Sequence, residues 1–264
     1  MSVGPLESTE KKDRVVRLEG LSNARDLGGL TTTDGRQTKF GLLYRSDAPA
    51  ELTPADVENL IGTRGLRTVV DLRSPLETSH DGEGPLQRAG VEYTNLPLSS
   101  DPNIQTLVPE LVKGTLSGHY LGYLGSGGER VIAAARLLAD PDHQPALVHC
   151  AAGKDRTGTL VAILLDAVGV RPEEIVADYT LTDANMAGVI ERVRRRLRAS
   201  GADRDQSGRA PLNLPEEALR ARPETMIEFL DQLTTVFGGG AAWLRVHGLT
   251  DAELTRFRAN FLTN

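Results

Sequence analysis

Short apolar runs along the first 150 residues predict the strands of a sheet. Each run is rich in apolar or β-branched residues and is bounded by polar residues, glycine or proline. Five segments have this pattern: Val15–Leu18, Leu42–Tyr44, Thr68–Asp71, Val91–Leu96 and Ala146–His149. Helical patterns lie between several of them. Strands that alternate with helices predict an α/β fold with a mainly parallel central sheet flanked by helices.

Apolar positions at helical spacing predict several helices, most of them after residue 150. In the first half, one helix begins at Thr53-Pro54, and another covers Gly128–Ala139 before Asp140-Pro141 ends it. The later helical segments are Thr157–Val168, Pro172–Leu181, Asp183–Ala199, Pro223–Phe237 and Thr250–Phe261. Since no strand pattern occurs among them, we expect a helix-rich C-terminal half.

A single domain is the simplest organisation for this chain. Residues 1–14 are polar and aperiodic, which predicts a flexible tail, and residues 15–264 contain no repeat and no long linker. The polar segment Ser200–Leu214 is the strongest candidate for a mobile loop. The helix before it carries Arg192, Arg194 and Arg195 opposite an apolar face. A solvated basic face is the ordinary interpretation of such a helix, and a helical lid over residues 181–222 is the sharper one.

Composition and charge exclude several classes of function. With 39% hydrophobic and 25% charged residues, the chain resembles soluble globular proteins. A net charge of −6 and 4% aromatic residues argue against nucleic-acid binding. A single cysteine excludes an internal disulfide and a multi-cysteine metal site. No apolar run is long enough to predict a signal peptide or a transmembrane helix, so we expect a cytoplasmic protein without cofactor. Export without a signal peptide stays open.

The segment His149–Gly158, HCAAGKDRTG, carries the candidate chemistry. Cys150 follows an apolar strand and precedes the apolar helix TGTLVAILLDAV. A helix N-terminus and nearby cations favour the thiolate, which is the nucleophilic form of cysteine. The backbone between strand and helix could form a nest of N–H groups for three phosphate oxygens. Arg156, six positions after Cys150, could hold two oxygens with its planar guanidinium.

The other residues of this segment have supporting roles in the same hypothesis. Gly153 allows a backbone angle that a side chain would forbid. The hydroxyl of Thr157 could hydrogen-bond the sulfur, and His149 could organise the loop from behind. A lone buried cysteine is usually inert, but the residue types and their placement here favour a nucleophile. The predicted phosphate-binding residues are Ala151, Ala152, Gly153, Lys154, Asp155 and Arg156.

The segment resembles the signature loop of the protein tyrosine phosphatase superfamily, Cys-x5-Arg followed by Ser or Thr. With Asn23–Gly29 (NARDLGG) upstream, it is similar to the bacterial tyrosine/serine phosphatases, which include a secreted mycobacterial phosphatase and bacterial phosphoinositide phosphatases. Further similar segments are Tyr44–Ser46, Asp71–Ser74, Val176–Tyr179 and the closing GGGAAWLRVHGL. The resemblance implies a protein tyrosine phosphatase-like fold over about residues 15 to 262. It also implies that Arg25 and Asp26 brace the catalytic loop.

Three aspartates could be the general acid that protonates the leaving oxygen. Asp101 follows the predicted strand Val91–Leu96, so a parallel sheet would bring its loop to the same edge as Cys150. The resemblance also implies an acid on this loop. Asp71 ends another strand at that edge, but pairing with Arg73 is its simpler role. Asp155 lies inside the loop, where it could orient Arg25 or Lys154 or place the hydrolytic water, and it is our second choice for a direct chemical role. Asp101 is our first choice.

These features predict a phosphomonoester hydrolase with a phosphocysteine intermediate, acting on phosphotyrosine protein and with dual specificity open. Lys154 raises an alternative, because the pattern Cys-x2-Gly-Lys-x-Arg resembles phosphoinositide phosphatases, whose substrates carry extra phosphates. Most lysines simply point to solvent. A sulfurtransferase also uses a cysteine loop but has less need for Arg156. A catalytically inactive phosphate-binding module would need no nucleophile.

Overall fold

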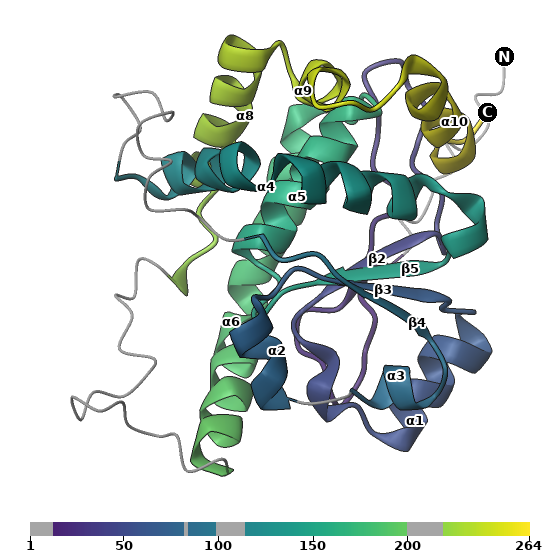
Figure 1. Cartoon of the computed structure of the whole chain (residues 1–264), viewed down its shortest axis with the longest axis vertical. Helices are drawn as coiled ribbons and strands as arrows, with labels where there is room; N and C mark the ends of the chain where they lie inside the picture. Colours follow the sequence, from purple (N-terminus) through teal and green to yellow (C-terminus); the bar gives the residue numbers. More distant parts are fainter. Residues whose placement is uncertain (1–12, 82–83, 99–113, 200–218) are drawn as a thin grey trace, which may run out of the picture.

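A five-stranded sheet forms the centre of the computed structural model, which describes residues 13–81, 84–98, 114–199 and 219–264 (Figure 1). The strand order is β1-β2-β5-β3-β4. The strands are β1 (Arg25–Asp26), β2 (Leu43–Ser46), β3 (Thr68–Asp71), β4 (Glu92–Asn95) and β5 (Ala146–His149). Only β1 and β2 pair in antiparallel fashion, and all other neighbours are parallel. The predicted α/β fold with a mainly parallel sheet is confirmed.

Alternate residues of the central strands enter two separate cores. Val70 of β3 and Val148 of β5 belong to the larger core, which the C-terminal helices share. Val69 and Leu147 point to the opposite face and belong to the smaller core. Because both faces are covered, the strands consist of consecutive buried residues rather than alternating apolar and polar ones.

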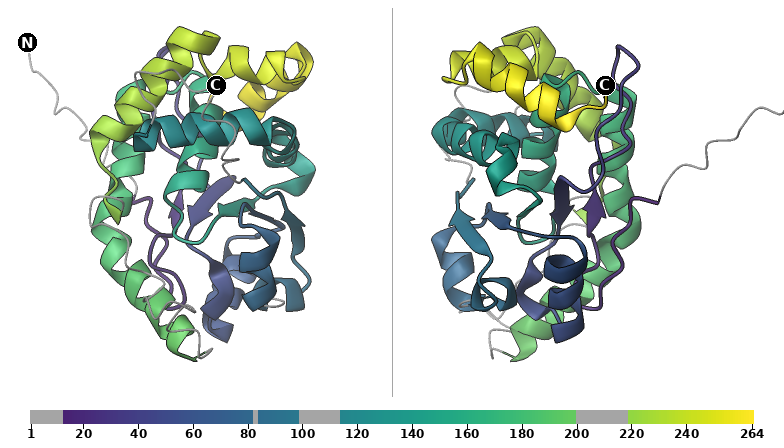
Figure 2. Two further views of the ribbon diagram at one scale, coloured as in Figure 1. Left: turned by 60° about the vertical axis from the view of Figure 1, so that its left-hand side comes forward. Right: turned by 90° about the vertical axis from the view of Figure 1, so that its right-hand side faces the viewer.

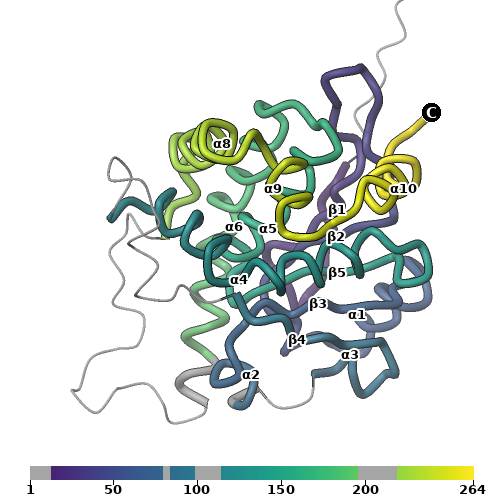
Figure 3. The backbone as a smooth tube through the Cα atoms, turned by 45° about the horizontal axis from the view of Figure 1, so that its top comes forward, coloured from purple at the N-terminus to yellow at the C-terminus, as the bar shows by residue number. Residues whose placement is uncertain are grey.

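Helices cover the sheet on both faces (Figures 1 and 2). Three short helices lie on the lower side in Figure 1, α1 (Pro54–Glu58), α2 (Pro75–Asp81) and α3 (Pro85–Arg88). On the other side lie α4 (Leu116–Ala139), α5 (Asp155–Ala167), α8 (Pro223–Phe237), α9 (Gly240–Val246) and α10 (Asp251–Phe261). The long helix α6 (Pro172–Ala199) runs past the end of the sheet. Figure 3 shows α4 crossing above β5 and β3, with α8 and α9 beyond it.

Several elements differ from those that the sequence predicts. Val15 makes a single bridge to Arg25, and Val15–Leu18 forms no strand. Helix α4 begins at Leu116, twelve residues before the predicted start at Gly128, and the two helices predicted between Pro172 and Ala199 are one. Strand β1 and the helices α2, α3 and α9 were not predicted. In α4 the burial of Tyr120 and Leu124 outweighs the low helix propensity of the glycines around them.

Two predictions lie outside the described residues. These are the tail before Asp13 and the loop Ser200–Leu214, so the lid stays a prediction. Arg14, at the end of the predicted tail, contacts Asp178. Within the described part of the chain, no helix has the length and apolar composition to cross a membrane.

Candidate active site

The central strand β5 delivers Cys150 to the carboxyl edge of the parallel strands. Its last residue, His149, pairs with Ser46 of β2 on one side and with Asp71 of β3 on the other. Cys150–Lys154 then form a loop, and α5 begins at Asp155. The carboxyl edge of a parallel sheet is where α/β proteins place their binding sites. Cys150 is 2% exposed and lies at the base of this loop.

The carbonyl groups of the loop all point outward to partners. Four acceptors receive four separate donors: Cys150 O from His149 Nδ1 at 3.1 Å, Ala151 O from Ala48 N at 3.1 Å, Ala152 O from Asn23 Nδ2 at 3.0 Å and Gly153 O from Arg45 Nη2 at 2.7 Å. In contrast, no backbone N–H from Ala151 to Arg156 donates to another described residue. The loop is therefore a nest of amide donors at a helix N-terminus, a geometry that can bind an oxyanion.

Glycine is required at one position of this loop. Gly153 has a φ of 68°, in the left-handed region. A Cβ atom at this position would lie 2.3 Å from the carbonyl oxygen of Ser46, which belongs to the backbone of β2. Because neither the angle nor the space admits a side chain, Gly153 allows the loop to approach β2 closely.

Arg156 is held by a residue that the sequence analysis missed. Its Nη1 and Nη2 atoms each lie 2.7 Å from a carboxylate oxygen of Glu77 on α2. Burial alone would raise the pKa of Glu77, but Arg156 and the amide of Ser74 hold it at about 2. Burial alone would lower the pKa of Arg156, and Glu77 raises it instead. The pattern Ser74-x-x-Glu77 is a capping signature that could have drawn attention to Glu77.

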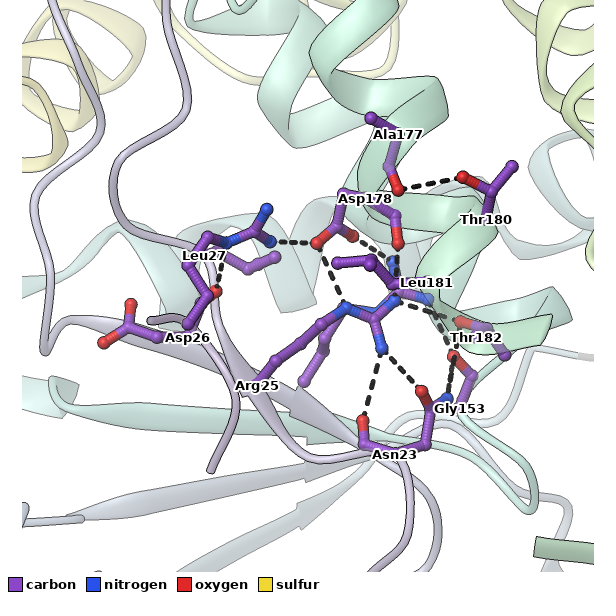
Figure 4. Close-up of polar contacts among 12 residues, drawn as sticks. Asn23, Arg25, Asp26, Leu27, Gly153, Ala177, Asp178, Thr180, Leu181 and Thr182 are labelled. Atoms are coloured by element: carbon purple, nitrogen blue, oxygen red, sulfur yellow. Dashed lines mark hydrogen bonds and ion pairs between the residues drawn. The ribbon is translucent and has the colours of Figure 1, made fainter. Parts of the chain in front are cut away.

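A buried network of charges supports the loop from behind (Figure 4). Asp178 of α6 accepts hydrogen bonds from Arg25, Arg45 and Arg14. Burial opposes ionisation of Asp178, but the three guanidinium groups hold its pKa well below the usual range. Burial and the nearby Arg45 lower the pKa of Arg25 to about 10. The carboxylate of Asp178 is therefore ionised. Arg45, which binds this carboxylate, also donates to the carbonyl oxygen of Gly153.

Arg25 and Asp26, the two predicted bracing residues, have different partners. Arg25 donates to Asp178, to the hydroxyl of Thr182 and to the side-chain oxygen of Asn23, whose own amide reaches the loop (Figure 4). Arg25 thus acts on the loop through Asn23 and Asp178. The carboxylate oxygens of Asp26 accept the N–H groups of Gly28 and Gly41, so Asp26 organises the chain around β1.

Asp71 is held in a second buried cluster on the opposite side of the loop. Its oxygens accept from Arg73 and from the hydroxyl of Tyr93 at 2.8 Å, and one lies 3.6 Å from Nε2 of His149. Burial would raise its pKa, but His149 and Arg73 lower it to about 2. The pKa of His149 is lowered by burial, and its Nδ1–H donates to Cys150 O. Asp71 and His149 thus lie in one cluster beside the loop, and their bracing role stays a prediction.

Lys154 does not point to solvent. Its side chain is 2% exposed, and Nζ lies 2.7 Å from Oδ1 of Asp155 and 3.4 Å from the carbonyl oxygen of Arg220. The same Asp155 oxygen accepts the hydroxyl of Tyr120, which also contacts the hydroxyl of Tyr179 at 2.7 Å. Burial raises the pKa of Tyr120, so the phenol stays protonated. Asp155 is therefore the anionic partner of Lys154, one of the contacts that the sequence alternatives name.

Asp101 and Thr157 are two further site residues that the sequence predicts. Asp101 lies outside the described residues. The hydroxyl of Thr157 is buried and has no hydrogen-bond partner among the described residues, so the predicted hydrogen bond to the sulfur of Cys150 is not formed in this structure. In the same part of the chain, no group of three or more His, Cys, Asp or Glu residues has the geometry of a metal site.

Comparison by sequence identifies relatives of this chain among the tyrosine phosphatases. Residues 16–263 match the tyrosine phosphatase family. A protein of Cupriavidus necator named as a tyrosine-protein phosphatase is 38% identical over 60% of this chain, and the match covers 59% of that protein. The triple specificity protein phosphatase PtpB of Mycobacterium tuberculosis is 27% identical over 94% of this chain and 99% of its own length. The catalytic core of the phosphatase Siw14 of S. cerevisiae has a TM-score of 0.35 and 17% identity, covering 61% of this chain and 88% of that one.

Proposed function

Because the chain belongs to the tyrosine phosphatase family, we propose that it hydrolyses phosphomonoesters through a phosphocysteine intermediate formed on Cys150. The single observation that carries this proposal is the loop after β5. Four of its carbonyl groups are bound from outside, while the amides from Ala151 to Arg156 stay available to an oxyanion. Such a cradle around a cysteine supports attack on phosphorus rather than simple phosphate binding.

In the first step the thiolate of Cys150 attacks the phosphorus atom. The S–P bond forms as the bond from phosphorus to the leaving oxygen breaks. The loop amides and the guanidinium of Arg156 stabilise the negative charge on the three equatorial oxygens, which is the main electrostatic contribution in such sites. The leaving oxygen takes a proton from Asp101, the acid that we propose on the sequence argument.

In the second step a water molecule attacks the phosphocysteine. Asp101, now a carboxylate, takes a proton from the water, the S–P bond breaks, and orthophosphate leaves while the thiolate is regenerated. Asp71 and Asp155 are weaker candidates for this proton transfer. Both carboxylates are already bound, Asp71 by Arg73 and Tyr93 and Asp155 by Lys154 and Tyr120.

Phosphotyrosine protein is the substrate that we propose. The alternative of a phosphoinositide rested on Lys154 as a binding group for a further phosphate. The burial of Lys154 and its ion pair with Asp155 weaken that argument, because the ammonium group already has an anionic partner. The name of the Mycobacterium relative records three specificities for that protein, so a phosphoserine or phosphothreonine substrate is a second candidate here.

Phosphate release from three substrates, without added metal, tests this proposal. We expect a phosphotyrosine peptide to be hydrolysed faster than a phosphoserine peptide or a phosphoinositide. We expect Asp101→Ala to lower kcat by about 10²- to 10⁴-fold, the usual contribution of general acid catalysis. Faster release from the lipid would favour the phosphoinositide alternative. Wild-type turnover in Asp101→Ala would reject Asp101 as the acid.

A further inference from the structure

A cavity of about 310 Å³ lies beside β1 and β2, away from the catalytic loop. Five of the residues that line it matter for its chemistry: Asp13, Arg14, Asp26, Tyr44 and Arg64. Its volume is at the lower end of the range of small-molecule sites, about 300–1,000 Å³. The cavity is separate from the site described above, because it contains none of the residues from His149 to Gly158.

Three side chains that line this cavity still have hydrogen-bond donors to offer. Tyr44 is 4% exposed, and its hydroxyl oxygen is hydrogen-bonded to Arg64, while its O–H proton has no acceptor among the described residues. Arg64 donates through Nε to Asn59 and through its guanidinium to Tyr44, which leaves further N–H groups of this guanidinium without a described partner. Arg14 uses Nε and Nη2 for Asp26 O and Asp178, so its Nη1 has no partner among the described residues. Two guanidinium groups and a phenol thus converge on one space.

The acceptors around the same cavity are already in use. The carboxylate oxygens of Asp26 accept from the amides of Gly28 and Gly41, both at 2.8 Å. Asp13 is exposed at the rim, where it accepts from the amide of Val15 and pairs with Arg17. Burial raises the pKa of Tyr44, so its hydroxyl keeps its proton and can act as a donor. The cavity therefore offers donors, and its ligand must supply acceptors.

The geometry points to a binding site for a small oxyanion, a phosphate or a carboxylate, held by Arg14, Arg64 and Tyr44. Guanidinium groups bind such anions through paired N–H donors. The guanidinium carbon of Arg64 lies 5.9 Å from the centre of the Tyr44 ring, a contact that helps to fix this side chain above the cavity. Arg14 also binds Asp178, so this one side chain connects the cavity to the network that supports the catalytic loop.

Calorimetric titration with inorganic phosphate tests this site, because the number of bound ions distinguishes it from the catalytic loop. We expect two phosphate ions to bind per wild-type chain and one per Arg64→Ala chain. Arg67→Ala is the matched control: Arg67 is exposed, lies on the same segment and does not line the cavity. This variant should still bind two. Equal numbers in Arg64→Ala and Arg67→Ala would overturn the proposal.

A second series of variants removes phosphate binding at the catalytic loop, so that only the proposed cavity site is measured. Arg156→Ala should bind one phosphate ion, and Arg156→Ala with Arg64→Ala should bind none. Tyr44→Phe, which removes only the hydroxyl, should weaken binding at the remaining site about tenfold, the usual effect of losing a hydrogen bond to a charged group. Malonate in place of phosphate shows whether carboxylates are also accepted. If a folded Arg156→Ala variant binds neither anion, no second site exists.

Discussion

The two ion-pair systems on either side of the catalytic loop differ in their exposure to water. Behind the loop, the side chains of Asp178, Arg25 and Arg45 are 1%, 2% and 1% exposed. In front, Arg156 and Glu77 are 17% and 36% exposed. The buried system binds the backbone of the loop, whereas the open pair holds Arg156, the side chain that we propose binds the phosphate. We therefore expect changes behind the loop to affect mainly stability and changes in front to affect mainly activity.

The physical reason for this difference is desolvation. Removing one partner of a buried ion pair leaves an uncompensated charge, which costs about 3–5 kcal/mol. Exposed pairs contribute only about 0–1 kcal/mol, because water solvates the remaining partner. The same type of contact thus has different consequences on the two sides of one loop.

The largest effect should come from Asp178→Ala. Three guanidinium groups would lose their shared carboxylate, so we expect the free energy of unfolding to fall by about 3–5 kcal/mol. Urea unfolding followed by circular dichroism measures this change. Asp183→Ala, in the same helix, is the control, since its pair with Arg220 is exposed and should contribute about 1 kcal/mol or less. Equal losses in the two variants would contradict the account.

Glu77→Gln should separate activity from stability. The substitution keeps the size of the side chain but removes the charge that holds Arg156. We expect kcat/KM to fall about 10- to 100-fold, as for other small displacements of a catalytic group. The free energy of unfolding should change by about 1 kcal/mol or less. The control is Glu92→Gln, which removes the exposed partner of His143 and should alter neither kcat/KM nor the free energy of unfolding. An unchanged kcat/KM in Glu77→Gln would show that Arg156 does not need Glu77 for its position.

Acid should destabilise the protein through the carboxylates of Asp71 and Glu77. In the folded protein the pKa values of Asp71 and Glu77 are about 2, below the ordinary values near 4. Their contribution is therefore complete above pH ~4 and is lost as pH falls toward 2. Thermal unfolding between pH 5 and 2 should show a smaller loss of stability in Asp71→Asn than in wild type. An identical pH dependence in the two proteins would mean that protonation of Asp71 does not contribute to acid unfolding.

The smallest effect should come from Tyr93→Phe. This change removes one hydrogen bond to Asp71, worth about 1 kcal/mol, and leaves the carboxylate bound by Arg73. Urea unfolding should detect this loss, while kcat and KM for a phosphotyrosine peptide should stay at wild-type values. A clear fall in kcat would indicate that the Asp71 cluster acts on chemistry as well as on structure.

The sequence predicts the strand, the glycine turn and the helix around Cys150 well, because the information for them is local. The strand Ala146–His149, the glycine at 153 and the helix after Lys154 are contiguous, and each follows from residue type and spacing. The sheet is predicted for the same reason, since buried parallel strands consist of short apolar runs. The strand predicted at Val15–Leu18 fails because nothing in a short apolar run reveals whether a partner strand exists.

The support of the loop could not be predicted, because it joins distant residues. Arg45 and Asp178 are 133 positions apart, and Arg156 and Glu77 are 79 apart. The break predicted between Leu181 and Asp183 has the same origin. Thr182 and Asp183 resemble a helix cap, but Thr182 is buried and its hydroxyl accepts from Arg25, so α6 continues through it. Local propensity is overruled there by a tertiary contact.

The most direct test of the central claim is to trap the intermediate. Wild-type protein and Cys150→Ser would be mixed with a phosphotyrosine peptide, quenched in acid within the first turnover and analysed by mass spectrometry. The account predicts one phosphoryl group on the wild-type peptide that contains Cys150, and neither modification nor phosphate release in Cys150→Ser. Phosphate release by Cys150→Ser at the wild-type rate, or a phosphoryl group on another residue, would contradict it.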